Sequence, residues 1–109
     1  MNSSEKTPNK RILIVDDEAD VLDFLRLYLE SLGLEITTSL STAEALELLS
    51  EHPHFMVITD IAMPDMDGYE FVGEIHKRKH CVQIALMTGF GYNPNHTLVK
   101  LYKTEKYPC

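Results

Sequence analysis

The amino-acid sequence predicts an α/β fold, in which a parallel β-sheet is covered by helices on both faces. Short apolar segments alternate along the chain with amphipathic ones, and the connections between them are short. The apolar segments are continuous rather than alternating, a pattern typical of strands that are buried on both faces. Strand–helix alternation with short connections favours right-handed crossovers within one parallel sheet.

The length and composition indicate one globular domain. The chain has 109 residues, of which 44% are hydrophobic and 25% are charged, close to the globular average. Its net charge of -7 argues against a general nucleic-acid-binding or anionic-membrane-binding surface. We find no apolar run long enough to cross a membrane and no secretory signal, so we expect a cytoplasmic protein. Cys81 and Cys109 are expected to be free thiols.

Each element is predicted from the spacing of its apolar residues. These recur every three or four positions in the helices, whereas apolar or β-branched residues are contiguous in the strands. Gly33 and Pro53 follow the first two helices, and Ser41 opens the second with a Ser-x-x-Glu capping box. After a polar tail at residues 1–10, the predicted strands cover residues 12–15, 35–39, 55–58 and 82–87, and the predicted helices cover residues 19–32, 42–51 and 69–79.

The segment after Gly89 gives a weaker prediction. Residues 90–95 resemble a loop, and only a short helix over Thr97–Tyr102 is expected beyond them. A fourth helix, fifth strand and fifth helix would take about 39 residues at average lengths, whereas 22 residues follow Met87. We therefore expect residues 11–109 to form one domain that is incomplete at its C-terminus and lacks its last helix. The sheet face left uncovered is expected to be open, or to be covered by a partner or a second copy of the chain.

Residues suited to chemistry stand at the carboxyl ends of three predicted strands. Asp16 and Asp17 follow the first strand, Asp60 follows the third, and Thr88 follows the fourth. In an open parallel sheet these ends meet at one edge, where the functional groups of such folds collect. Converging carboxylates repel one another, and a hard divalent cation such as Mg²⁺ relieves the repulsion.

The sequence therefore predicts a Mg²⁺ site with Asp17 and Asp60 as ligands and Asp16 acting through water. Asp60 can also accept a phosphoryl group as an aspartyl phosphate, and the Thr88 hydroxyl can donate a hydrogen bond to the phosphoryl oxygens. Taken alone, an aspartate after a strand is more often a turn residue or a helix N-cap. Three carboxylates at matching strand ends favour the shared functional site.

Three segments of the chain resemble the receiver domain of two-component response regulators. They are residues 12–18 (ILIVDDE), residues 57–70 (VITDIAMPDMDGYE) and residues 86–89 (LMTG). The resemblance covers residues 11 to about 91 and implies a flavodoxin-like, doubly wound parallel sheet of strand order 2-1-3-4-5. It also implies that Asp60 is the phosphoacceptor, that Asp16, Asp17, Asp60 and the backbone carbonyl of Ala62 bind Mg²⁺, and that Thr88 is a switch hydroxyl.

The resemblance further implies a signal receiver rather than a metabolic enzyme. The phosphoryl donor would be a histidine kinase or a histidine phosphotransfer protein, and the output would pass to an unknown downstream protein. A homodimer through the exposed C-terminal face is a further expectation. The phosphate-contacting lysine of the family is matched best by Lys103, which comes 15 residues after Thr88.

Two other functions stay open on the sequence. The irregular C-terminal third would suit a receiver-like interaction module that is degenerate or independent of phosphorylation. A Mg²⁺-dependent aspartyl phosphatase also uses an aspartate nucleophile, but it normally has a general acid two positions later, where this chain has Ala62.

Overall fold

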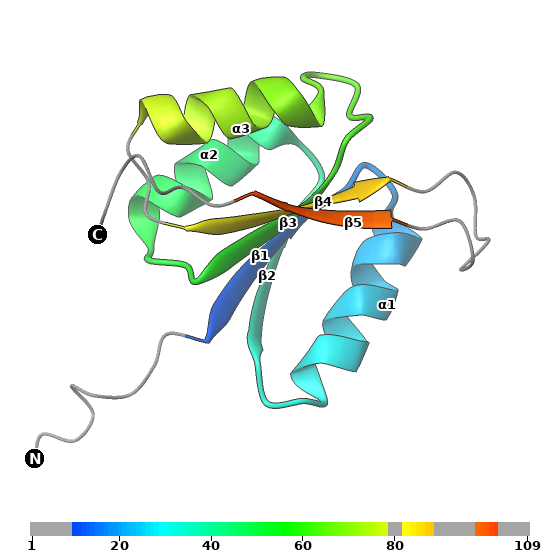
Figure 1. Ribbon diagram of the computed structural model, residues 1–109. Helices are drawn as coiled ribbons and strands as arrows, with labels where there is room; N and C mark the ends of the chain where they lie inside the picture. Colours follow the sequence, from blue (N-terminus) through cyan, green and yellow to red (C-terminus); the bar gives the residue numbers. More distant parts are fainter. Residues whose placement is uncertain (1–9, 79–81, 89–97, 103–109) are drawn as a thin grey trace, which may run out of the picture.

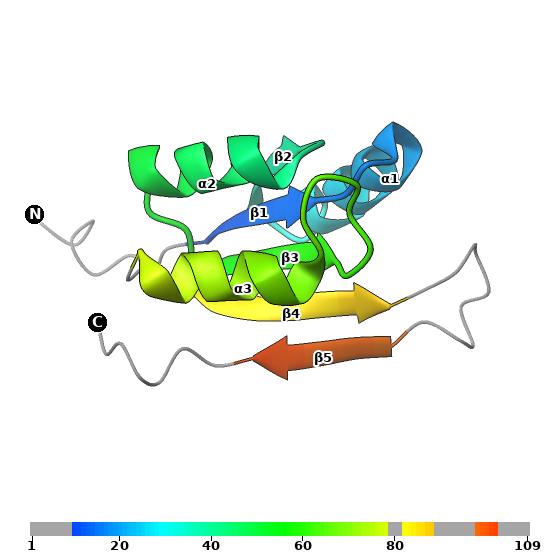
Figure 2. The ribbon, with the colours of Figure 1, turned by 90° about the horizontal axis from the view of Figure 1, so that it is seen from above.

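The computed structural model describes residues 10–78, 82–88 and 98–102. Within them, a five-stranded sheet has the order β2-β1-β3-β4-β5 (Figures 1 and 2). The strands are β1 (Arg11–Val15), β2 (Glu35–Ser39), β3 (Met56–Asp60), β4 (Gln83–Thr88) and β5 (Leu98–Tyr102), and the helices are α1 (Ala19–Glu30), α2 (Thr42–Glu51) and α3 (Gly68–Lys77).

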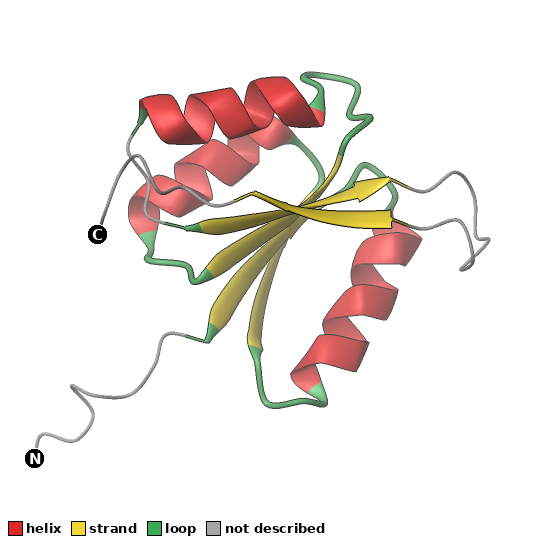
Figure 3. Ribbon diagram, viewed as in Figure 1, coloured by secondary structure: helices red, strands yellow, loops and turns green. Residues whose placement is uncertain are grey.

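Helices cover the two faces of the sheet unequally. α2 and α3 lie on one face, and α1 lies on the other (Figures 1 and 3). Leu13 belongs to the larger core cluster, which contains buried residues of α2 and α3, among them Phe71. Ile12 and Ile14 belong to the smaller cluster, together with Leu22 of α1. Successive residues of β1 thus enter opposite cores, as expected for a strand with a continuous apolar sequence.

The first four strands confirm the predicted parallel sheet. β1 pairs in parallel with β2 and β3, and β3 pairs in parallel with β4. The strand order β2-β1-β3-β4-β5 is the flavodoxin-like order that the resemblance implied.

The direction of the fifth strand differs from the prediction. β5 has the expected place at the edge of the sheet but runs antiparallel to β4, with Thr88 opposite Leu98 (Figure 2). Only nine residues separate the two strands, whereas a parallel crossover takes about a dozen or more. The predicted short helix over Thr97–Tyr102 was also wrong, because residues 98–102 form β5. Apolar, β-branched and aromatic residues dominate this segment and suit a paired strand.

Several sequence predictions concern residues outside the described part of the chain. They involve residues 1–9 of the tail, Cys81, Cys109, Lys103 and any helix after β5.

Side-chain caps and one glycine define the helix ends. Ser41 and Asp67 directly precede α2 and α3, and each side chain caps its helix by accepting a hydrogen bond from the backbone N–H three residues later. α1 ends at Glu30, earlier than predicted, and Gly33 then takes a positive φ of 89° in the turn to β2. Within the described residues, no helix is both long enough and apolar enough to span a membrane.

Candidate metal site

Three aspartates meet at the carboxyl edge of the sheet. Asp16 and Asp17 directly follow β1, and Asp60 is the last residue of β3. One carboxylate oxygen from each lies within 4.8 Å of the others. The two strands are paired neighbours, with Val15 opposite Thr59, so the residues that follow emerge side by side. The structure thus brings together the three carboxylates whose convergence the sequence predicted.

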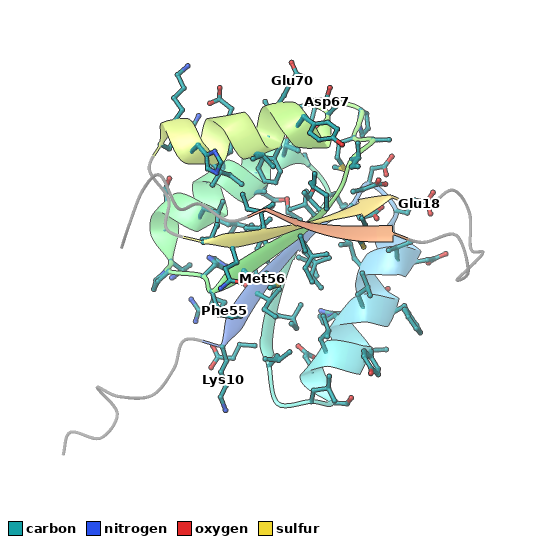
Figure 4. All side chains as sticks on the ribbon, viewed as in Figure 1. Lys10, Glu18, Phe55, Met56, Asp67 and Glu70 are labelled. Carbon is teal, nitrogen blue, oxygen red and sulfur yellow. The ribbon has the colours of Figure 1, made fainter. Side chains whose placement is uncertain are left out.

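Other parts of the molecule show where this edge lies. Glu18 is next to Asp17 in the chain, and Asp67 is at the start of α3. Figure 4 shows both residues toward the same end of the sheet. Lys10 and Phe55 are at the opposite end (Figure 4). The carboxylate cluster is therefore framed by the β1–α1 turn and the β3–α3 loop.

Asp16 is the buried member of the cluster. Only 5% of its surface is exposed, and its Oδ1 accepts a hydrogen bond of 2.9 Å from the Glu18 N–H. Burial raises the pKa of Asp16 to about 6; the bond from Glu18 opposes this shift, and the charges of Asp60 and Asp17 add to it. The Asp16 N–H donates to the Ser39 carbonyl at 3.1 Å, which fixes the start of the β1–α1 turn against β2.

Asp60 and Asp17 extend the cluster toward solvent. Asp60 is half-buried, and its Oδ1 accepts a hydrogen bond of 3.1 Å from the Ala62 N–H. Burial raises the pKa of Asp60, the bond from Ala62 opposes the shift, and the charge of Asp17 adds to it. Asp17 is exposed. The cluster therefore reaches from the protein interior to the surface.

The donor set fits a hard divalent cation. Carboxylate oxygens are the ligands that Mg²⁺ prefers, and Mg²⁺ keeps several waters, which an exposed side of the site permits. Besides burial, the charges of Asp60 and Asp17 raise the pKa of Asp16, and a cation bound between the carboxylates would relieve this repulsion. Asp16, Asp17 and Asp60 could hold the ion, with the Ala62 carbonyl as a further donor.

The loop between β3 and α3 is held tightly at its ends. The Gly68 N–H donates to the Ile61 carbonyl at 2.6 Å. A Cβ atom at Gly68 would lie 2.8 Å from the Ile61 Cα and 3.3 Å from the Asp60 carbonyl oxygen. Glycine is required here because the start of α3 passes directly against the residue that carries the candidate site.

The remaining predicted site residues are placed in part. Thr88 ends β4, one position beyond Met87, which stands opposite Asp60. The backbone of Thr88 thus lies at the edge that holds the aspartates. Lys103 lies outside the described residues, and Tyr102, which precedes it, stands opposite Ile84 near the other end of β4.

Sequence reasoning did not single out Asp65. Its Oδ2 accepts hydrogen bonds from the Thr42 hydroxyl at 2.7 Å and the Thr42 N–H at 3.0 Å. Thr42 comes 23 residues earlier in the chain, and no local pattern joins the two positions.

Comparison with known proteins identifies the family. A family model described as "Response regulator receiver domain" matches residues 12–105. The chain belongs to this family. The resemblance predicted from the three sequence segments is therefore confirmed, and the receiver domain is a signalling domain rather than a classical enzyme.

Relatives of known name support this membership. The response regulator SaeR of Staphylococcus aureus (strain USA300) is 40% identical over 77 residues, which are 71% of this chain and 33% of SaeR. This receiver domain chain thus spans about a third of the length of the curated relatives that it matches.

Solved receiver structures share the fold. The response regulator TrrA of Thermotoga maritima, in complex with Mg²⁺ and BeF, has 38% identity and a TM-score of 0.69, over 80% of this chain and 76% of that one. A CheY-like receiver domain protein of Methanospirillum hungatei JF-1 has 32% identity and a TM-score of 0.71, over 81% of this chain and 70% of that one. A chain in the complex of histidine kinase ThkA with TrrA has 39% identity and a TM-score of 0.69, over 78% and 73% of the two chains.

Proposed function

We propose that this receiver domain accepts a phosphoryl group on Asp60 in a reaction that requires Mg²⁺. The observation that carries the proposal is the cluster of Asp16, Asp17 and Asp60, whose oxygens lie within 4.8 Å of one another. Such a cluster is costly without a cation, and a phosphoryl group would add about 1.5 to 2 further negative charges. A site built only to cap turns has no need for this concentration of charge.

The chemical step follows from the position of Asp60. A carboxylate oxygen of Asp60 attacks the phosphorus, and the bond from phosphorus to the donor's histidine nitrogen breaks. The donor's imidazole ring carries a proton on its other nitrogen, so when the first nitrogen keeps the electron pair of the broken bond the ring leaves as neutral imidazole. When bound by Asp16, Asp17, Asp60 and the Ala62 carbonyl, Mg²⁺ supplies positive charge against the phosphoryl oxygens.

Proposed partners follow from similar proteins. Because a similar chain occurs in a histidine kinase complex, we assign the donor role to a histidine kinase or a histidine phosphotransfer protein. The phosphorylated state would control binding to a downstream protein, and the Thr88 hydroxyl would hydrogen-bond to the phosphoryl group as the switch. A cytoplasmic location and a homodimer through the C-terminal face are parts of the same proposal.

Intact-mass spectrometry tests the proposal. With acetyl phosphate and Mg²⁺, the wild type should gain one phosphoryl group, and a chelator should prevent the gain. Asp60→Asn should gain none, whereas Asp67→Asn, which removes an acid from the nearby loop, should react like the wild type. An adduct that survives Asp60→Asn would overturn the assignment.

One observation favours a second function, that of a receiver-like interaction module independent of phosphorylation. β5 runs antiparallel, so its last residue, Tyr102, lies near the end of the sheet opposite to Asp60. The role of Lys103 as the phosphate-contacting lysine therefore stays a prediction. A folded wild type that gains no phosphoryl group in the mass experiment would favour the interaction module.

A further inference from the structure

Asp65 joins the β3–α3 loop to the first turn of α2. Its Oδ2 accepts hydrogen bonds from the Thr42 hydroxyl at 2.7 Å and from the Thr42 N–H at 3.0 Å, and the Ala43 N–H lies 3.4 Å from the same atom. Thr42 is completely buried. The first backbone N–H groups of a helix have no partner within the helix, and here a residue from a distant loop supplies one.

The start of α2 stabilises the charged form of the Asp65 carboxylate. Slight burial raises the pKa of Asp65, but the hydrogen bonds from Thr42 and Ala43 outweigh that effect and lower it below its ordinary value. The positive end of the α2 dipole also favours a negative charge at the helix start. The contact is therefore a charge-assisted anchor between two segments of the chain.

The same turn of α2 is linked through Ser39 to the segment that carries Asp16. The Ser39 hydroxyl lies 2.7 Å from the Ser41 carbonyl and 2.9 Å from Glu44 Oε1. The Ser39 carbonyl accepts the hydrogen bond from the Asp16 N–H. The start of α2 is thus bonded directly to the loop that follows Asp60 and is linked through Ser39 to the segment that carries Asp16.

Between Asp60 and Asp65 the inner side of the loop is attached to the sheet and the core. The Ile61 N–H donates to the Met87 carbonyl at 3.1 Å, and Met63 is buried in the larger core cluster. The Ala62 N–H bonds to Asp60, and the Ile61 carbonyl accepts from Gly68. Ala62 is exposed, so packing of its side chain does not hold the backbone there. The bonds of Asp65 to Thr42 hold the outer end of the loop, so the path of the backbone at Ala62 depends on this contact together with the burial of Met63.

We propose that Asp65 is a positioning residue for the metal site. By bonding to Thr42 it fixes the loop that carries the Ala62 carbonyl, and through the same bond a change at the site reaches the start of α2. The inference rests on the proposed function, because it takes the aspartate cluster as a Mg²⁺ site. Loss of an outer residue that orients a metal ligand weakens metal affinity about 10- to 100-fold.

A Mg²⁺ titration followed by ¹⁵N–¹H nuclear magnetic resonance tests the inference. In the wild type, the amide signals of Thr42 and Ala43 should shift as Mg²⁺ is added. In Asp65→Ala, the Kd for Mg²⁺ should rise about tenfold or more, and these two signals should no longer respond. Asp65→Asn keeps an oxygen that can accept from Thr42. Thr42→Val keeps the shape of the side chain and the bond from the backbone N–H to Asp65, but it loses the bond from the hydroxyl. Both variants should therefore give intermediate Kd values.

Two control variants test whether the effect of Asp65→Ala on Mg²⁺ binding comes from loss of helix stability or from loss of one negative charge in the loop. Ser41→Ala removes the side-chain cap of α2 but leaves Asp65 in place. Asp67→Asn removes a charge from the same loop, at a residue that caps α3 instead. Both should bind Mg²⁺ within about twofold of the wild type, because neither change removes the bonds between Asp65 and Thr42 and the loss of one exposed charge acts weakly on the site. If either weakens binding as much as Asp65→Ala, or if Asp65→Ala binds like the wild type, the inference is wrong.

The titration uses Mg²⁺ alone, so it is independent of phosphoryl transfer. If the wild type binds Mg²⁺ but gains no phosphoryl group, the proposed function fails while the role of Asp65 can still hold. If the wild type is phosphorylated and Asp65→Ala binds Mg²⁺ normally, only the inference fails. A wild type that does not bind Mg²⁺ overturns both.

Discussion

Burial of Asp16 beside two other carboxylates links the candidate site to stability. The pKa of Asp16 rises from 3.8 to about 6 on folding, so the folded protein holds this proton more tightly than the unfolded chain. The stabilising contribution is complete below pH 3.8 and is lost as the pH rises through about 6. At neutral pH the metal-free protein therefore carries an unfavourable charge at Asp16.

Asp16→Asn should stabilise the metal-free protein. We expect the free energy of unfolding to rise by about 1–3 kcal/mol at pH 7.5, and by less at pH 4.5, where folded Asp16 is mostly protonated. Asparagine keeps an oxygen that can accept the bond from Glu18. Urea unfolding in the presence of a chelator measures the effect, and an equal gain at both pH values would contradict the explanation.

His54 also makes stability depend on pH, so Asp16→Asn must be compared with the wild type at each pH. It is 4% exposed, its Nδ1 lies 2.9 Å from the His52 carbonyl, and its Nε2 has no hydrogen-bond partner among the described residues. Burial lowers the pKa of His54, and the charge of Arg11 adds to this while the bond to His52 opposes it. Its contribution to stability is present above pH 6.5 and is lost as the pH falls, opposite to that of Asp16.

Between elements, the start of α3 lies close against the end of β3, which carries Asp60. A methyl group at Gly68 would lie 2.8 Å from a backbone atom of Ile61, whereas a methyl group at Gly73, also in α3, would meet nothing within 4 Å. The two glycines therefore provide a matched pair within one helix.

Gly68→Ala should destabilise the protein, and Gly73→Ala should stabilise it. We expect a loss of about 1–3 kcal/mol for Gly68→Ala from forced backbone shifts, and a gain of about 0.5–1 kcal/mol for Gly73→Ala from helix propensity. Gly68→Ala should also weaken Mg²⁺ binding, because the backbone of Asp60 and Ile61 must move. Urea unfolding and Mg²⁺ titration test the pair; equal stabilities for the two variants would refute this packing argument.

Much at the scale of elements could be predicted because its causes are local. The continuous apolar residues of β1 and the capping box at Ser41 are visible in the sequence, and the strand ends place Asp16 and Asp60 at one edge. The direction of β5 was missed because pairing with β4 decides it. The bond from Asp65 to Thr42 was missed because it joins segments far apart in the chain.

At the scale of the whole molecule, the two faces of the sheet are covered unequally. Within the described residues α1 is the only helix on its face (Figure 1). Two aromatic residues of α1, Phe24 and Tyr28, are 69% and 57% exposed, and they are four residues apart, so they lie on one side of the helix. Met56 and Ile58 of β3 are only partly buried beside the smaller core cluster. Within the described part of the chain, the α1 side of the molecule therefore carries exposed apolar side chains.

The α1 side should dominate binding of a hydrophobic dye. The double variant Phe24→Gln, Tyr28→Gln should bind less dye than the wild type, because it removes exposed aromatic surface next to the thinly covered face. Tyr69→Gln is the control, since Tyr69 is 52% exposed but lies on α3, on the other face. Fluorescence titration measures the difference, and equal loss in both variants would argue against a special role for the α1 side.

The central claim is that Asp60 is the residue that carries the phosphoryl group, supported by Asp16 and Asp17. Borohydride reduction of an acyl phosphate converts the aspartate to homoserine, and tandem mass spectrometry then locates it. After treatment with acetyl phosphate and Mg²⁺, we predict homoserine at position 60 alone, and none when a chelator is present. Homoserine at Asp16, Asp17, Asp65 or Asp67, or at no position in folded protein, would contradict the claim.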